Sequence, residues 1–237
     1  MTHDLTPLGD PIGPIVRNWT PRARPPRTAM TGRFCAVVPL SAREHAADLY
    51  AAQALDGDGR MWTWMPNGPW ASEAEYAAWA EAAEASEDPQ FFAVVESVTG
   101  KPVGTCSYLR IDPANGVVEV GWIAWSPLLQ QTPAATEAMY LMMARVFDDL
   151  GYRRYEWKCN DLNAASKRAA ERLGFTFEGL FRQAVVVKGR NRDTAWYSIL
   201  DHEWPRAKAA FEAWLSPDNF DEDGLQKRSL TDIRNAL

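Results

Sequence analysis

The chain has 237 residues, enough for one large domain or two small ones. Hydrophobic residues make up 46% and charged residues 24% of it, which excludes wholesale disorder, collagen-like repeats and a polytopic membrane protein. The formal net charge of -6 argues against binding of nucleic acid over the whole surface, because neutralising phosphates requires an excess of Lys and Arg.

Residues 1–33 are predicted to form an extended arm without regular structure. They contain six prolines and five arginines, and proline-rich segments favour an extended backbone. Two helices are expected further along, because Ser41 with Glu44 and Ser72 with Glu75 each place a hydroxyl three residues before a glutamate. That spacing is the capping box that begins a helix.

A strand is predicted at residues 34–39. Three further segments, residues 91–97, 103–111 and 117–125, have the period of two that marks strands. Tight turns at Thr99-Gly100 and Asn115-Gly116 join the last three segments. This arrangement predicts an antiparallel meander.

After the meander the hydrophobic period changes to 3.6. Met139, Met142, Val146 and Leu150 lie on one apolar stripe that ends at Gly151, the clearest helix pattern of the chain. The remaining predicted elements are a strand at 154–158, a helix at 164–173, strands at 184–187 and 195–200 that flank a loop, and a helix at 206–215.

The order of elements is mixed α/β and contains no internal repeat. It indicates one domain at residues 34–204, preceded by the arm at 1–33 and followed by a C-terminal helix and acidic tail at 205–237.

Cys35, Cys106 and Cys159 are widely spaced, so neither a disulfide framework nor a zinc site is expected. The three histidines also lack metal-ligand spacing, and we predict no metal. Reduced cysteines favour a cytoplasmic location. No apolar run approaches the roughly 18 to 20 residues of a membrane helix, and the N-terminus lacks a signal-peptide pattern.

Charge and tryptophan are unevenly distributed. Residues 71–90 contain six acids and no base, whereas residues 151–192 contain ten bases and four acids. The first segment favours a cationic ligand and the second a polyanionic one, unless both are solvated faces. Eleven tryptophans indicate an interior rich in pockets, because an indole prefers sites that are apolar at one edge and offer its N–H a partner.

Three segments together match one known family. They are the strand Glu119-Val-Gly-Trp-Ile123, the helix start Ala135-Thr-Glu-Ala138, and Asn163-Ala-Ala-Ser166 followed by Glu171-Arg-Leu-Gly-Phe175. The chain, over about residues 34–204, resembles the GNAT acyl-CoA N-acyltransferases and within them the RimJ/RimL-like branch. The resemblance implies an α/β fold with a twisted, mostly antiparallel central sheet, split between its fourth and fifth strands, with helices on both faces.

The resemblance also implies acetyl-CoA as cosubstrate. The pantetheine arm would insert into the split almost like an extra strand, bonded by the backbone at the end of the fourth strand, and the loop that follows would hold the pyrophosphate. The implied cofactor contacts are Ile123, Ala124, Trp125, Gln130, Gln131, Thr132, Ala134, Ala135, Thr136, Asn163 and Ser166.

The pyrophosphate loop departs from the family pattern. Pro133 replaces the central glycine and has no N–H to donate. Thr132 and Pro133 nevertheless fit the cap and first position of a helix, whose N-terminus attracts anions. The side chains of Gln130, Gln131 and Thr132 are expected to supply donors in partial substitution.

Attack of a neutral amine on a thioester needs a base, donors for the oxyanion and an acid for the thiolate. Glu119 is the candidate base, because a carboxylate among valines is costly to bury and therefore indicates a role. The alternative is a strand glutamate held in a salt bridge. Many family members use a tyrosine as the acid, but that position here is Ala170. The resemblance therefore implies Ser166, which otherwise caps its own helix.

The aromatic segment 61–70 is predicted to line the acceptor pocket through Trp62 and Trp64, with Tyr108 opposite, or else to form a hydrophobic plug. A basic set is expected near the phosphates of CoA, with solvated helix charges as the alternative. It comprises Arg153, Arg154, Lys167, Arg168 and Arg172.

We therefore expect an enzyme: a cytoplasmic, acetyl-CoA-dependent N-acetyltransferase that acts by direct attack of a primary amine, either a protein or peptide N-terminus or a small amine. The expected partners are acetyl-CoA and this amine, with no nucleic acid and no membrane, and a homodimer is compatible with the sequence. The rival hypothesis is a GNAT-fold protein that binds CoA without turnover.

Overall fold

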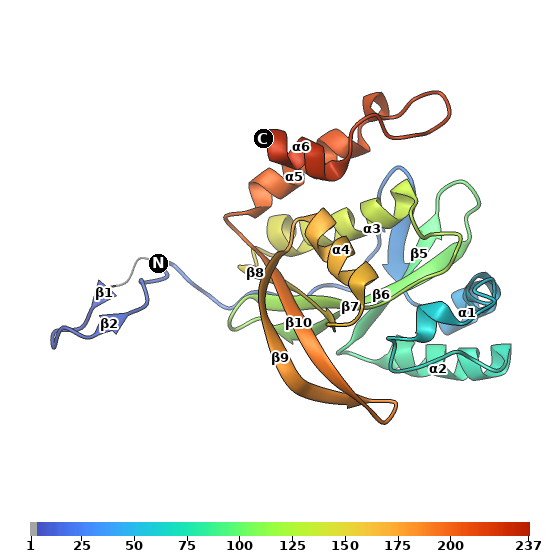
Figure 1. Ribbon diagram of the computed structural model, residues 1–237, viewed down its shortest axis with the longest axis horizontal. Helices are drawn as coiled ribbons and strands as arrows, with labels where there is room; N and C mark the ends of the chain where they lie inside the picture. Colours follow the sequence, from blue (N-terminus) through green and yellow to red (C-terminus); the bar gives the residue numbers. More distant parts are fainter. Residues whose placement is uncertain (1–3) are drawn as a thin grey trace.

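The computed structural model describes residues 4–237. Eight strands form one twisted sheet in the order β3-β4-β5-β6-β7-β8-β10-β9, and β1 pairs with β2 in a separate ribbon (Figure 1). The strands are β1 (Asp4–Leu5), β2 (Pro11–Ile12), β3 (Met30–Thr31), β4 (Cys35–Pro39), β5 (Gln90–Glu96), β6 (Pro102–Asp112), β7 (Val117–Trp125), β8 (Arg154–Asn160), β9 (Thr176–Val187) and β10 (Arg190–Leu200). All neighbouring pairs are antiparallel except β7 and β8.

Strands β7 and β8 pair over only part of their length and then diverge. Parallel pairing joins Val117–Val120 to Arg154–Trp157, and within the described chain it continues no further. On its other side β7 carries a register shift against β6, where Trp122 adopts a φ of 50°. Such a bulge bends and twists its strand, so the last residues of β7 lean away from β8. The predicted split between the fourth and fifth strands of the domain is confirmed.

The helices lie on both faces of the sheet, as predicted, with α1 and α2 on one face and α3 and α4 on the other (Figure 1). The α-helices are α1 (Ala42–Gln53), α2 (Glu73–Ala85), α3 (Pro133–Ala144), α4 (Ala164–Leu173), α5 (Trp204–Leu215) and α6 (Leu230–Ala236). A π-helical turn, Arg145–Asp149, continues α3.

Each face of the sheet has its own hydrophobic core. Beneath α3, the methionines Met139, Met142 and Met143 are buried in a large core shared with α4, α5 and α6. Beneath α1 and α2, a smaller core is built around Tyr76 and Phe91. The cavities described below lie where these two layers meet the split in the sheet.

The N-terminal arm is fixed along the domain by polar contacts at its C-terminal half. The indole N–H of Trp19 donates to the carbonyl of Ala114 at 2.9 Å, and Arg22 Nε donates to the carbonyl of Gly151 at 2.9 Å. The prediction of an arm without regular structure is wrong for three short segments, since β1 and β2 form a ribbon and β3 pairs with β4.

The C-terminal third contains more structure than the sequence pattern predicted. Strands β9 and β10 begin well before residues 184 and 195 and are joined by a tight turn at Lys188-Gly189. The tail includes α6, whose Leu230 and Ile233 are buried against the main core. Arg234 donates to the carbonyls of Arg172 at 2.6 Å and Glu171 at 3.0 Å, which ties α6 to the end of α4.

Candidate active site

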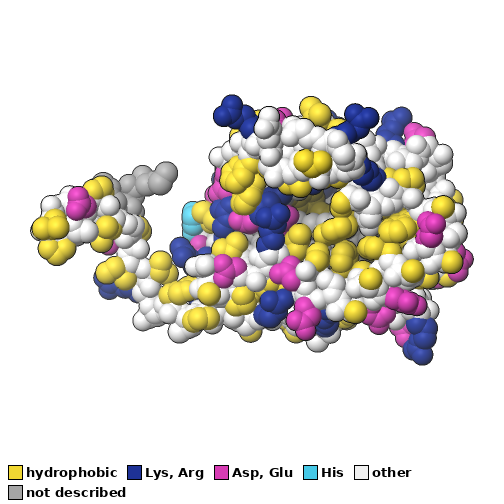
Figure 2. Space-filling model, turned by 90° about the horizontal axis from the view of Figure 1, so that it is seen from below, with side chains coloured by type: hydrophobic (Ala, Val, Ile, Leu, Met, Phe, Trp, Pro, Cys, Tyr) yellow, Lys and Arg dark blue, Asp and Glu magenta, His cyan; other side chains and the backbone are white. Residues whose placement is uncertain are grey.

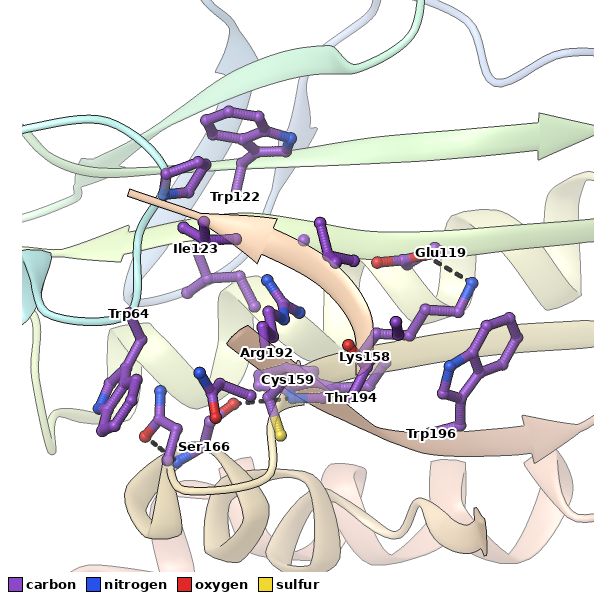
Figure 3. Close-up of a pocket in the computed structure, with 18 of the residues that line it drawn as sticks. Trp64, Glu119, Trp122, Ile123, Lys158, Cys159, Ser166, Arg192, Thr194 and Trp196 are labelled. Atoms are coloured by element: carbon purple, nitrogen blue, oxygen red, sulfur yellow. Dashed lines mark hydrogen bonds and ion pairs between the residues drawn. The ribbon is translucent and has the colours of Figure 1, made fainter. Parts of the chain in front are cut away.

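A cavity of about 570 Å³ opens beside the split between β7 and β8 (Figure 3). Its walls come from the ends of β7 and β8, the start of α4, the β9–β10 hairpin and the loop before α2. It brings together five of the predicted site residues: Trp64, Glu119, Ile123, Asn163 and Ser166. On the face seen from below, hydrophobic side chains gather in a hollow bordered by acidic and basic ones (Figure 2).

Glu119 lies in this cavity, where its buried carboxylate pairs with one buried and one exposed cation. Its Oε2 is 2.8 Å from Lys158 Nζ and 3.1 Å from Arg110 Nε. Lys158 also lies 2.7 Å from Glu156 and stacks over the ring of Trp196 at 3.6 Å from its centroid. The carboxylate is therefore held in place by two cations, so the predicted alternative of a salt-bridged glutamate describes its contacts.

Burial raises the pKa of the Glu119 carboxyl above its ordinary value, although Lys158 and Arg110 lower it in part. A carboxylate with a raised pKa accepts a proton more readily than an exposed one, as a general base near neutral pH must. The geometry therefore suits both a structural and a catalytic role for Glu119.

Ser166 occupies the first turn of α4. Its backbone N–H donates to Oδ1 of Asn163, the helix cap, at 3.1 Å, and its Oγ accepts from the indole N–H of Trp157 at 3.0 Å. Because Trp157 fills an acceptor position of the hydroxyl, the Ser166 proton is free to point at another group. One such group is the Cys159 thiol. Burial raises the pKa of this thiol above its ordinary value, although the Ser166 hydroxyl lowers it in part.

The aromatic loop before α2 contributes one tryptophan to the cavity. Trp64 lines it together with Met65 and Pro66. Trp62, in contrast, is buried beneath Gly68 and packs edge-on against Trp70, so it does not line the cavity.

The structure places Tyr108 on the opposite face of β6. It is fully buried in the main core, where its hydroxyl donates to the carbonyl of Met142 at 2.8 Å. Its sequence neighbour Leu109 faces the cavity instead. The assignment of Tyr108 to the acceptor pocket does not agree with this geometry, because adjacent strand residues point to opposite faces.

A second cavity, of about 530 Å³, lies on the α3 and α4 side of the split. It is lined by the predicted cofactor residues Trp125, Gln131, Thr132, Ala135 and Thr136, and also by Pro133. Trp157, the last β8 residue that pairs with β7, lines both cavities. The two cavities therefore approach each other at the split.

The start of α3 is capped as predicted. Thr132 Oγ1 accepts from the backbone N–H of Ala135 at 3.3 Å, and Pro133 occupies the first helical position. A residue at that position has no partner for its N–H inside a helix, so the proline removes one free donor. The next amide, of Ala134, remains without an intrahelical partner.

Two of the three side chains expected to donate to the pyrophosphate are engaged within the loop. Gln130 Nε2 donates to the carbonyl of Trp125 at 2.8 Å, and the Thr132 hydroxyl donates to the carbonyl of Leu129 at 2.7 Å. Gln131 lines the cavity with a φ of 61°. Of the three side chains predicted to replace the N–H donor that Pro133 lacks, only Gln131 has no such contact within the loop.

Only Arg172 of the predicted basic set lines the second cavity. Its guanidinium donates to Thr136 Oγ1 at 3.1 Å and stacks over Trp214 at 5.2 Å, and within residues 4–237 it forms no ion pair. Burial lowers the pKa of Arg172, and the nearby Arg234 lowers it further. Of the other members, Lys167 pairs with Asp161, Arg154 pairs with Glu156 and Glu178, Arg153 lies over Trp19, and Arg168 is exposed.

Sequence reasoning missed cavity residues on β10 and in the C-terminal segment. Arg192, Thr194 and Trp196 alternate along β10 and all line the first cavity, and this period of two was the available signal. Phe220 and Leu225 line the second cavity from beyond α5, and nothing in their sequence pattern indicated it.

Within residues 4–237, no helix is long and apolar enough to cross a bilayer. No group of three His, Cys, Asp or Glu side chains in the same residues is arranged to hold a metal ion.

Comparison with known proteins assigns the family. Residues 37–176 match the model described as "Acetyltransferase (GNAT) domain". The crystal structure of a GCN5-related N-acetyltransferase from Brucella melitensis superposes with a TM-score of 0.91 and 52% identity, covering 93% of this chain and 100% of that one.

Two further proteins to which the chain is similar carry functional names. The first is YdaF of Bacillus subtilis (strain 168), whose name assigns it provisionally as a ribosomal N-acetyltransferase. It is 30% identical over 46% of this chain and 59% of its own length. The chain spans between half and about six tenths of the length of the curated relatives it matches. The microcin C7 self immunity acetyltransferase MccE, solved in complex with acetyl-CoA and AMP, shares the fold at 20% identity and a TM-score of 0.63, covering 74% of this chain and 97% of that one.

Proposed function

Since the chain belongs to the GNAT family of acetyltransferases, we propose that it transfers the acetyl group of acetyl-CoA to a primary amine. The observation that carries this proposal is the meeting of two cavities at Trp157, where β7 and β8 diverge. One cavity adjoins the N-terminus of α3, and the other contains Glu119 and Ser166.

The residues of the second cavity fit a polyanionic cosubstrate. The N-terminus of α3 offers an unpartnered amide and the positive end of a helix dipole, which stabilise phosphates. Arg172 adds a half-buried cation without a carboxylate partner in the described chain. These groups would hold the pyrophosphate, and the part of β7 at Ile123–Trp125, which does not pair with β8, would receive the pantetheine arm.

Acetyl-CoA supplies the activated thioester. The amine nitrogen forms a bond to the acetyl carbon while the carbon–sulfur bond breaks. The Glu119 carboxylate takes the proton that the amine loses, directly or through a water molecule, and the Ser166 hydroxyl gives a proton to the departing thiolate and regains one from solvent. Lys158 and Arg110 keep the base oriented in the cavity.

The finer assignments belong to the same proposal. A RimJ/RimL-like relationship is supported by the name of YdaF. A cytoplasmic location is supported by three free, buried cysteines, since disulfides are rare in reducing compartments.

The test combines binding and turnover on purified protein. We expect acetyl-CoA to raise the melting temperature, and a panel of amines to release free CoA thiol together with an acetylated product seen by mass spectrometry. Absence of a thermal shift would refute the cosubstrate assignment. Binding without thiol release from any amine would favour the rival function, CoA binding without turnover, for which the loss of an amide at Pro133 is the motivating feature.

A further inference from the structure

The charges that line the first cavity do not balance. Its lining contains Arg110, Lys158 and Arg192 but only one acid, Glu119. Arg110 and Lys158 both pair with Glu119, and Lys158 also pairs with Glu156, which lies outside the lining. Within residues 4–237, no carboxylate lies within ion-pair distance of Arg192.

Two polar groups on neighbouring inward positions of β10 are also unsatisfied. Arg192 Nε and Thr194 Oγ1 are both buried, and neither has a hydrogen-bond partner in the described chain. Thr194 is only 4% exposed, and both side chains border the cavity (Figure 3). Burying such groups without partners costs free energy, so they indicate a ligand that accepts hydrogen bonds.

The surrounding walls are aromatic. Phe181 stacks on Trp196 with ring centroids 4.3 Å apart, and Trp64 closes the cavity from the loop before α2. The volume of about 570 Å³ suits a small molecule. None of the six acids of residues 71–90 lines this cavity, so the preference for a cationic ligand expected from that segment has no counterpart here.

We propose that the acceptor is a small amine that carries a carboxylate or phosphate group, bound by Arg192 and Thr194 while its amino group faces Glu119. This inference rests on the proposed function and adds the substrate class. A guanidinium and a hydroxyl together offer several donors to one anionic group. The anion supplies the partner that the fold itself does not give Arg192.

The test uses pairs of amines that differ in the anionic group: phenylalanine with phenylalaninamide, and phosphoethanolamine with ethanolamine. We expect one anionic member to have a kcat/KM at least about tenfold higher than its neutral partner, mostly because its KM is lower. The pair that shows this difference identifies the anionic group as carboxylate or phosphate. Arg192→Gln should abolish this preference, because the kcat/KM of the anionic member falls far more than that of its neutral partner. Arg182→Gln, an exposed arginine on the same hairpin, is the matched control and should retain the preference.

Calorimetry separates this inference from the proposed function. The anionic amine should bind the CoA complex at least about tenfold more tightly in the wild type than in Arg192→Gln, whether or not turnover occurs. Equal kcat/KM for anionic and neutral members, or an equal loss for both in Arg192→Gln, would overturn the acceptor assignment. Tight, Arg192-dependent binding without thiol release would retain it and refute the proposed chemistry alone.

Discussion

At Glu119, burial and charge act in opposite directions. Burial raises the pKa of the carboxyl, and the ion pairs with Lys158 and Arg110 lower it. The result is a buried carboxylate that is held in one orientation and still accepts protons more readily than an exposed glutamate.

Replacing Glu119 should therefore change the rate and its pH dependence. We expect Glu119→Gln to lower kcat/KM about 100-fold or more at neutral pH, because the base is removed. In the wild type, kcat/KM should fall as the pH drops through the raised pKa of Glu119, above the ordinary range of a glutamate, since protonation removes the acceptor. This acidic limb should be missing from the Gln variant.

Acetyl-CoA affinity provides the control for that experiment. It should change little in Glu119→Gln, because Glu119 does not line the second cavity. An equal loss of cosubstrate binding and of kcat/KM would assign Glu119 a structural role.

A second buried glutamate has a structural task. Glu137 on α3 accepts hydrogen bonds from the backbone N–H groups of Arg33 at 2.8 Å, Phe34 at 2.6 Å and Cys35 at 2.9 Å. Its carboxylate lies so close to Gly32 that a Cβ there would clash with it. One side chain thus fixes the junction between the arm and β4.

Removal of this carboxylate leaves three amides without acceptors. We expect Glu137→Ala to lower the free energy of unfolding by about 2 to 4 kcal/mol, measured by urea denaturation. Glu81→Ala, on the exposed surface of α2, should have almost no effect. A similar small effect in both variants would contradict this account.

At the scale of elements, the β9–β10 hairpin and the loop before α2 close the first cavity together. Lys188 at the hairpin turn donates to the carbonyls of Trp62 at 3.1 Å, Asn67 at 3.3 Å and Gly68 at 2.8 Å. Because Trp64 and Phe181 come from these two segments, the lysine helps to hold the walls of the first cavity.

Loss of this link should weaken acceptor binding. We expect Lys188→Ala to raise the KM of the acceptor about fivefold and to leave kcat nearly unchanged. The reason is that the hydrogen bonds that order the cavity walls are lost, with a free energy of about 1 kcal/mol. Steady-state kinetics with the best acceptor gives both constants. Arg190→Ala, at the exposed start of β10 next to this turn, should behave as the wild type. An unchanged KM in Lys188→Ala would show that the link does not order the cavity.

The elements were predictable where local signals were strong. Helix α4 runs over the predicted residues because Asn163 caps its start and Gly174, with a φ of 102°, ends it. The first half of β9 was missed because Thr176–Gln183 mixes polar and apolar residues on an exposed edge strand. Its pairing with β10 comes from tertiary structure, which a local pattern does not report.

The candidate site was predictable only in part. Glu119 and Ser166 were found from motifs and do line one cavity. Tyr108 was assigned to it although Cys106 and Tyr108 share the core-facing parity of β6. Arg192 was passed over because its significance depends on the absence of a partner in the described chain, which only the folded arrangement reveals.

At the scale of the whole molecule, the tryptophans belong to several different environments. Trp62, Trp70 and Trp79 pack in or against the smaller core around α1 and α2. Only some of the eleven reach the cavities: Trp64, Trp122 and Trp196 line the first, Trp125 and Trp214 the second, and Trp157 both. The indication of a pocket-rich interior thus applies to both sides of the split.

The C-terminal segment extends the site beyond the residues that match the family model, 37–176. Helix α6 supports the end of α4 through Arg234, next to Arg172. We expect removal of residues 229–237 to lower the melting temperature and to weaken acetyl-CoA binding severalfold, because Leu230 and Ile233 leave the core. Deletion of the exposed Leu237 alone is the control; unchanged affinity in the longer deletion would separate this segment from the cosubstrate site.

The most direct test of the central claim is a crystal structure with acetyl-CoA bound. The account predicts the pantetheine arm between the diverging ends of β7 and β8, the pyrophosphate at the start of α3 beside Arg172, and the thioester near Trp157 and Ser166, facing the cavity that contains Glu119. Acetyl-CoA bound away from this split, or with its thioester outside the Glu119 cavity, would contradict the account.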